Sequence, residues 1–171
     1  MKYAYLDTPI GSLLLAGTTA ALELIAFPSG SRARAPDETW QLDARLFDAA
    51  RRQLDEYFAG QRRRFELDLA PRATPFQHKV LNALLGVAYG ETCSYTDIAR
   101  KIGAPKAVRA VGAANGANPL PIVIPCHRVL GADGSLTGFG GGLGRKRWLL
   151  DHERVRRGAD NRRTRHFSIF E

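Results

Sequence analysis

The sequence is poor in cysteine: its 171 residues hold only two, Cys93 and Cys126. Neither has a second cysteine or a regularly spaced histidine beside it. This pattern argues against a disulfide framework and against a zinc ribbon. We therefore expect two reduced thiols and a protein that needs neither a metal nor a cofactor.

Long apolar runs are also missing. No stretch approaches the roughly 20 apolar residues that a membrane-spanning helix requires, and residues 1–7 hold no apolar signal core. We therefore expect a cytoplasmic protein that makes no contact with membranes. Because 44% of the residues are hydrophobic, the chain can still bury the core of one domain or of two small ones.

Acidic residues are scarce in the second half only. Residues 1–73 hold ten basic and ten acidic side chains, whereas residues 74–171 hold fifteen basic and seven acidic ones, which accounts for the net charge of +8. A basic half beside a neutral half indicates nucleic-acid binding, since contacts with phosphates release counterions. Part of the charge lies in residues 157–171, which we expect to form a basic, mobile tail.

The first half has the pattern of a small α+β domain, which we place at residues 1–72. Three short apolar or β-branched segments, at 2–7, 12–16 and 21–27, predict an antiparallel sheet. Asp43 then suits the N-cap of a helix whose apolar residues through Tyr57 and Phe58 share one face.

The second half, residues 73–156, has the pattern of a mostly helical domain. Thr74 to Gln77 form a capping box with proline at the first helical position, which predicts a helix that continues to about residue 89. Ser94 caps a second helix over 95–102, and Pro105 begins a third over 106–115. The short gap between these two helices is typical of a helix-turn-helix. A last helix is expected over 145–153.

The third of these helices is built almost entirely from small residues, with Arg109 as the only long side chain in its middle. Small residues allow close approach to DNA, and a single arginine can enter a groove or the space left by a displaced base. The same composition also suits tight packing against a protein core. The helix alone leaves both interpretations open.

Cys126 lies in the run Ile-Val-Ile-Pro-Cys-His-Arg-Val, where a strand-like apolar stretch stops at Pro125. A buried cysteine at a strand end would be an ordinary structural residue. Here, however, His127 and Arg128 follow directly, and these two residue types best lower the pKa of a thiol. The pattern therefore predicts a nucleophilic cysteine held in a loop.

From Thr74 to Glu153 the sequence resembles the O6-alkylguanine-DNA alkyltransferases, also called methylated-DNA–protein-cysteine methyltransferases. The resemblance rests on Thr-Pro-Phe-Gln, Lys-Ala-Val-Arg-Ala-Val-Gly-Ala-Ala-Asn, Pro-Cys-His-Arg-Val and Gly-Gly-Leu-Gly-Arg-Lys-Arg-Trp-Leu-Leu. It implies direct-reversal repair of double-stranded DNA that contains alkylated bases. The alkyl group of O6-alkylguanine would pass irreversibly, once per molecule, to the cysteine of a protein that flips the base. O4-alkylthymine as a second substrate, and clustering of the protein along DNA, are left open.

The resemblance also assigns roles to individual residues. Cys126 would accept the alkyl group, with His127 as its base through a bridging water and Glu153 behind the imidazole. Asn118 would hold the turn before the active-site loop, and Tyr95 would donate a hydrogen bond to the guanine. The implied DNA contacts are Ser94, Tyr95, Ala107, Val108, Arg109, Gly112 and Arg128, and the implied contacts with the flipped base are Val129, Phe139 and Gly140.

The sequence departs from the family pattern at three positions. Phe139 stands where most members have tyrosine, so the pocket wall keeps its apolar ring but lacks a hydroxyl. Leu81 and Ala88 replace a common tryptophan and a common proline, and both changes concern packing.

Two other functions use the same residues. A thiol hydrolase would also need a cysteine, a histidine and an acidic residue, and a DNA-binding regulator would need the helix-turn-helix without the chemistry. A metal site made of Cys126, His127 and His152 is disfavoured, because adjacent ligands chelate poorly and a fourth ligand is missing.

Overall fold

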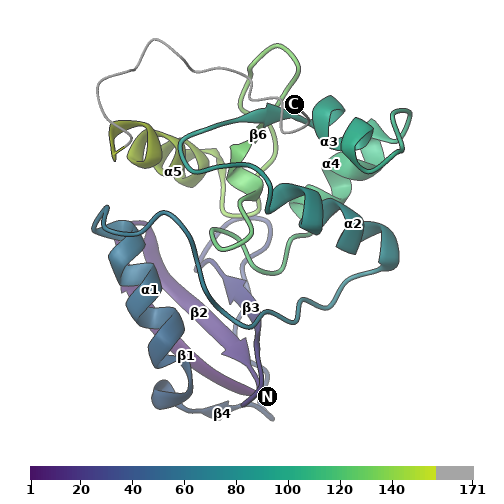
Figure 1. The fold of residues 1–171 in the computed structure, drawn as a ribbon. Helices are drawn as coiled ribbons and strands as arrows, with labels where there is room; N and C mark the ends of the chain where they lie inside the picture. Colours follow the sequence, from purple (N-terminus) through teal and green to yellow (C-terminus); the bar gives the residue numbers. More distant parts are fainter. Residues whose placement is uncertain (157–171) are drawn as a thin grey trace.

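A four-stranded sheet and one helix form the first half of the structure, a computed structural model that describes residues 1–156 (Figure 1). The strands are β1 (Lys2–Thr8), β2 (Gly11–Gly17), β3 (Leu22–Ala26) and β4 (Gln41–Leu42), in the spatial order β3-β2-β1-β4. The three predicted strands are present and pair antiparallel. The sheet as a whole is mixed, however, because β4 pairs in parallel with β1. Two exposed residues are too short a strand to show a sequence pattern.

The central strand β2 is buried on both faces. Leu13 and Leu15 point into the main core, whereas Leu14 and Ala16 belong to a smaller cluster on the other face. Met1, Tyr3 and Trp40 pack against that smaller cluster. A strand covered on both sides reads as a continuous apolar run rather than an alternating one, as the Leu-Leu-Leu-Ala segment does.

The helix of the first half lies along the sheet and ends near the second half (Figure 1). Asp43 accepts a hydrogen bond from the Leu46 amide and caps a short 3₁₀ helix, η1 (Ala44–Phe47), which continues as α1 (Asp48–Phe58). Leu54 and Tyr57 are completely buried. The predicted cap and apolar face are therefore confirmed, and α1 carries Tyr57 to the junction between the two halves.

The connection between the halves is an extended link. It pairs with the start of β3, since the Leu22 amide donates to the Asp68 carbonyl at 2.9 Å and the Ala70 amide donates to the Leu22 carbonyl at 2.9 Å. The link thus follows the edge of the sheet before the first helix of the second half begins.

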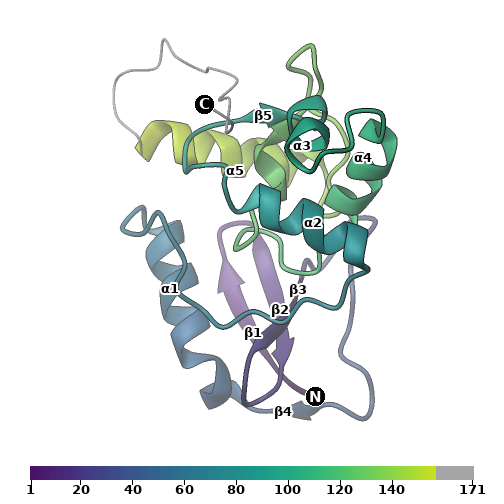
Figure 2. The same ribbon diagram turned by 45° about the vertical axis from the view of Figure 1, so that its right-hand side comes forward.

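Four helices dominate the second half, and Figure 2 shows α2, α3 and α4 grouped beyond the sheet with α5 beside them. Their bounds are α2 (Pro75–Leu84), α3 (Tyr95–Lys101), α4 (Val108–Gly116) and α5 (Leu143–Arg156). The predicted capping box at Thr74 is present, and the predicted cap at Ser94 forms a capping box as well. Several boundaries differ. The helix α2 stops at Leu84 because tight turns follow it, and α4 starts only at Val108 because residues 104–107 form a turn. The helix α5 extends beyond both ends of its predicted range, 145–153.

A short parallel ladder, which the sequence did not predict, ties this half together. In it β5 (Cys93–Ser94) pairs with β6 (Val129–Leu130), and β6 follows η2 (Cys126–Arg128), the 3₁₀ turn that contains the candidate nucleophile. The start of the helix-turn-helix and the cysteine loop are therefore held in a fixed relation.

Within the described residues, no helix has the length and hydropathy needed to cross a bilayer. The predicted mobile tail, residues 157–171, lies outside the described part of the chain.

Candidate functional site

Cys126 follows a tight turn rather than a strand, which corrects the sequence-based expectation. The Ile124 amide donates to the Leu120 carbonyl at 2.8 Å, and Ile122 adopts a left-handed φ of 74°. Asn118 spans this turn: its Nδ2 donates to the Ile124 carbonyl at 2.8 Å and its Oδ1 accepts from the Leu120 amide at 3.0 Å. Residues 121–129 are all buried. The thiol is thus carried on a rigid, enclosed loop.

A cavity of about 400 Å³ opens in front of Cys126 and is lined by both halves of the chain. Phe139 forms one wall and packs edge-to-face on Phe27, with ring centroids 5.4 Å apart. At Gly140, an added Cβ would lie 2.5 Å from Cγ of Arg32, so the close passage of the Arg32 loop requires glycine there. A volume of this size lies in the usual range for small-molecule pockets, roughly 300–1,000 Å³.

Tyr95, the first residue of α3, lies beside α4. The Tyr95 hydroxyl accepts a hydrogen bond from Thr137 Oγ1 at 3.2 Å, and a Cβ at Gly112 would lie 3.9 Å from the Tyr95 ring. Burial raises the pKa of Tyr95, so its hydroxyl keeps the proton and can donate it.

The helix α4 has two different faces. Val111 and Ala114 are buried in the core, Ala107, Val108 and Gly112 are half-buried, and Arg109 is exposed. Packing against the core therefore accounts for the small residues on one face, and close approach to DNA stays a prediction for the other. One face packs tightly inside the protein, and the other presents a nearly flat surface with one long cationic side chain.

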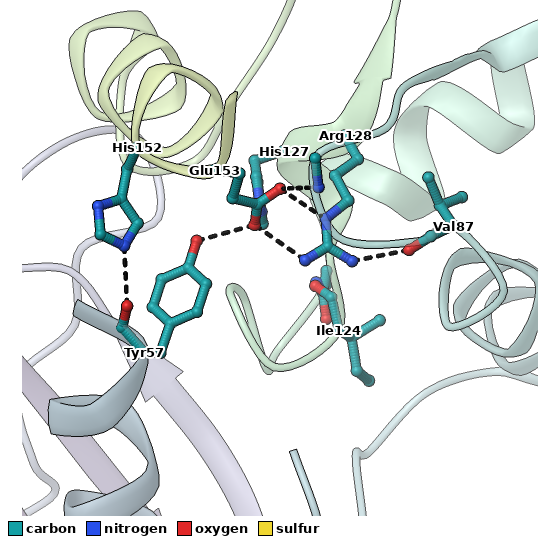
Figure 3. Close-up of polar contacts among 9 residues, drawn as sticks. Tyr57, Val87, Ile124, His127, Arg128, His152 and Glu153 are labelled. Atoms are coloured by element: carbon teal, nitrogen blue, oxygen red, sulfur yellow. Dashed lines mark hydrogen bonds and ion pairs between the residues drawn. The ribbon is translucent and has the colours of Figure 1, made fainter. Parts of the chain in front are cut away.

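Behind the thiol, Glu153 is the centre of a buried polar cluster (Figure 3). Its side chain is 1% exposed, and its two oxygens accept five hydrogen bonds. His127 Nε2 lies 2.7 Å from Oε1, and the Arg128 guanidinium donates to both oxygens, at 2.8 and 2.9 Å. The Tyr57 hydroxyl at 2.8 Å and the Gly90 amide at 3.2 Å supply the other two.

These contacts fix the protonation of Glu153 and His127. Burial opposes ionisation of Glu153, but His127 and Arg128 hold the pKa of its carboxyl well below the ordinary range. Burial lowers the pKa of His127, so its ring is neutral at pH 7. With Nε2 donating to the carboxylate, Nδ1 carries the lone pair, and among the described residues it has no hydrogen-bond partner. His127 is therefore ready to accept a proton at Nδ1.

The electrostatics of the thiol differ from the sequence-based expectation. Burial raises the pKa of Cys126, and the opposing influences come from a hydrogen bond with Asn118 and from the charge of Lys146. Lys146 is completely buried on α5, where its Nζ donates to the Val129 carbonyl at 2.6 Å and to the Thr137 carbonyl at 2.8 Å. Burial lowers the pKa of Lys146 to about 8, which leaves it mostly charged at neutral pH. The cation that favours the thiolate is thus Lys146.

Two of the predicted DNA contacts need correction. Arg128 is 6% exposed, and its guanidinium is used by Glu153 and by the Val87 carbonyl at 2.7 Å, so it can neither reach DNA nor face the thiol. Ser94 is also buried, and its hydroxyl caps α3 by accepting from the Asp97 amide. Both side chains serve the interior of the protein.

Sequence reasoning missed three residues of the site. The sequence pattern did not single out Lys146, and it placed Tyr57 only on an apolar helix face. Asn115 is buried at the end of α4, lines the cavity and donates to the Cys126 carbonyl at 3.3 Å. Their contact partners lie nine or more positions away in the chain, and no local pattern shows such contacts.

His152 does not join Cys126 and His127 in a metal site. Its Nε2 lies 2.8 Å from the Tyr57 carbonyl oxygen, and its ring stacks on Trp148 with centroids 4.8 Å apart. The described residues contain no group of three or more His, Cys, Asp or Glu side chains placed to hold a metal ion.

Comparison with known proteins adds independent evidence. Residues 1–71 match the family described as the ribonuclease-like domain of 6-O-methylguanine DNA methyltransferase, and residues 75–155 match the DNA binding domain of the same enzyme. A methylated-DNA–protein-cysteine methyltransferase of Methanosarcina acetivorans is 47% identical over 90% of this chain and 98% of its own. One of Mycobacterium bovis is 49% identical over 94% and 96%.

Solved structures give the same answer. The crystal structure of Mycobacterium tuberculosis OGT in complex with DNA superposes with a TM-score of 0.86 at 47% identity, covering 91% of this chain and 94% of that one. The structure of Mycobacterium tuberculosis O6-methylguanine methyltransferase gives a TM-score of 0.85 at 49% identity, over 93% and 96%. The likeness therefore extends over both halves of the chain.

Proposed function

The chain belongs to the 6-O-methylguanine DNA methyltransferase family, and we propose that it repairs DNA by taking the alkyl group of O6-alkylguanine onto Sγ of Cys126. The observation that carries this proposal is a single buried thiol at a cavity of about 400 Å³, backed by a neutral histidine and a fully hydrogen-bonded carboxylate. Residues 73–156 would bind DNA and hold the nucleophile, and residues 1–72 would complete the cavity and support it.

The transfer is a displacement at carbon. The proton of Sγ leaves toward Nδ1 of His127, through a bridging water, as the sulfur attacks the alkyl carbon in line with the O6 bond. Glu153 steadies the imidazolium that forms, and Lys146 favours the thiolate. Because the resting thiol and imidazole are both neutral, the thiolate forms as its proton passes to His127. Where water is excluded from the cavity, the electrostatic interactions of these charges are stronger.

The bond that breaks joins the alkyl carbon to O6, and its electron pair stays on the purine. The guanine then takes up a proton from the Tyr95 hydroxyl, and Tyr95 regains one from the imidazolium. The balance is one thiol and one alkylated guanine converted into one thioether and one guanine. Because an alkyl thioether is a poor leaving group and Cys93 is buried in β5, each molecule reacts once.

The lesion must leave the duplex before it can reach Cys126. Arg109, the long exposed side chain of α4, would fill the space in the base stack and offset part of the unstacking free energy. The flat surface formed by Ala107, Val108 and Gly112 would approach the groove, and Tyr95 would lie at the lesion. Val129, Phe139 and Gly140 would contact the flipped base.

The test uses a duplex oligonucleotide with one O6-methylguanine, supplied in excess over the protein. We expect a plateau at one methyl group per protein molecule, with the added mass of one methylene group located on Cys126 by peptide mass spectrometry. Continued turnover beyond the plateau, as a thiol hydrolase would show, contradicts the proposal. An unmodified Cys126, as expected of a regulator without chemistry, contradicts it too.

A further inference from the structure

The hydroxyl of Tyr57 donates a hydrogen bond that joins the first half of the described chain to Glu153, at 2.8 Å. Tyr57 is the last but one residue of α1, 96 positions before Glu153, and it is completely buried. Burial raises its pKa well above the ordinary value, so the hydroxyl remains protonated and donates to Oε1. The same oxygen receives the imidazole of His127.

The phenol ring has little freedom to turn away. It packs against Phe58, Phe65, Tyr89 and His152, with ring centroids between 5.2 and 6.1 Å apart. Its backbone is tied as well, because His152 Nε2 lies 2.8 Å from the Tyr57 carbonyl oxygen and Phe58 packs on Trp148 of α5. Figure 3 shows Tyr57 of α1 and His152 of α5 facing each other, with the Tyr57 hydroxyl directed at Glu153.

Oε1 carries three of the five hydrogen bonds to the carboxylate: Tyr57, His127 and Arg128. Arg128 fixes the plane of the carboxylate through two parallel bonds. The Tyr57 hydroxyl comes from the other half of the chain and occupies the remaining side of Oε1. A donor at this position limits where the His127 imidazole can lie, as the partners behind a metal-bound histidine do.

On the basis of the proposed function, we infer that Tyr57 is a positioning residue, through which the first half of the chain holds Glu153 and His127 in the geometry that deprotonates Cys126. Reactivity at the thiol then depends on the docking of α1 against α5. The first half is thus more than a wall of the cavity, because it supplies one hydrogen bond to the reactive cluster itself.

The main test is Tyr57→Phe, which removes one hydroxyl and keeps the packed ring. We expect the single-turnover rate constant at saturating lesion duplex to fall about tenfold, with unchanged affinity for that duplex. The matched control is Gln53→Met, one turn earlier on α1. It removes two buried hydrogen bonds with Glu66 but makes no contact with Glu153. All rates are taken at a temperature where circular dichroism shows every variant folded.

A second measurement separates this inference from the proposed function. Iodoacetamide alkylates Cys126 without DNA, and peptide mass spectrometry gives the rate. Slower alkylation in Tyr57→Phe than in Gln53→Met supports positioning even if the wild type accepts no methyl group from DNA. Equal rates in wild type and Tyr57→Phe, or equal losses in both variants, overturn it.

A double-mutant cycle shows whether Tyr57 acts through Glu153. In a Glu153→Gln background, Tyr57→Phe should cause no further loss of iodoacetamide reactivity, because the carboxylate it positions is already gone. If the two losses multiply, Tyr57 contributes independently of Glu153, and the inference fails.

Discussion

The two sides of Cys126 are built in opposite ways. Behind the thiol, Glu153, His127 and Arg128 form a buried cluster in which the carboxylate accepts five hydrogen bonds. In front of it, aromatic rings and exposed arginine side chains line the cavity, and α4 presents small side chains around the exposed Arg109. The first region is fixed by interactions within the protein, and the second leaves its surface for a partner.

This difference separates two tasks. Charges that must act at one atom need a dry, rigid surrounding, because there they are strong and need no rearrangement during the reaction. A surface that accepts a flipped base in any sequence context needs little specific contact. Variants behind the thiol should therefore slow transfer from duplex DNA and from the free base equally, whereas variants on the exposed face of α4 should affect the duplex alone.

The largest effect is expected from the atom that both sides share. Cys126→Ala should abolish methyl transfer completely, since no other thiol faces the cavity, and it should leave the affinity for lesion-containing duplex intact. Transfer assays with labelled oligonucleotide and fluorescence anisotropy measure the two properties. Residual transfer to Cys93 would refute the assignment.

Glu153→Gln probes the region behind the thiol. It leaves the buried Arg128 without its counter-charge, so we expect a loss of about 3 kcal/mol of unfolding free energy and a fall in transfer rate of about 10² to 10³. Urea denaturation and single-turnover kinetics measure these. As control, Glu56→Gln breaks the half-exposed pair with Arg62 and should change stability by less than about 1 kcal/mol.

Arg109→Ala probes the region in front. We expect transfer from duplex to fall about tenfold, in line with a cost of base extrusion of a few kcal/mol, and transfer from free O6-methylguanine to stay at the wild-type rate. Arg100→Ala, which removes an exposed charge from α3, should weaken DNA binding without this selective loss. An equal fall with both substrates would remove the contrast between the two sides.

Low pH should destabilise the buried polar cluster around Glu153 specifically. The pKa of Glu153 is lowered in the folded state, so its contribution to stability is complete above the unfolded value, about 4.3, and is lost as pH falls below it. The pKa of His127 is also lowered, and its contribution declines below about 6.5. The melting temperature, measured between pH 7.5 and 4, should begin to fall near the unfolded-state pKa of histidine, about 6.5, and should fall more steeply near that of glutamate, about 4.3. In Glu153→Gln the steeper part should be much reduced.

The smallest effect concerns the second thiol. Burial raises the pKa of Cys93 to about 12, which makes it inert, and its side chain in β5 is completely buried. Cys93→Ala should cost about 1 kcal/mol of stability through the small void and leave the methyl-transfer rate unchanged. A slower rate would mean that the β5–β6 ladder transmits packing changes to Cys126.

Much of the fold could be predicted because its signals are local. The capping boxes at Thr74 and Ser94, the cap at Asp43 and the three apolar strands all follow from residues within a few positions of one another. The β5–β6 ladder and β4 could not be predicted, since strands of two residues have no period to detect.

By itself, the sequence determined the α+β architecture, the family and the presence of Cys126, His127 and Glu153, because these depend on short patterns and on the identity of residues. Only the tertiary structure decided what each charge faces. Arg128 follows two residues after Cys126, yet the 3₁₀ turn directs it into Glu153, whereas Lys146 from α5 influences the thiol. Tyr57 reaches Glu153 across 96 positions. The physical reason is that a pKa depends on distances and burial in space, and these are set only when the two halves of the chain pack together.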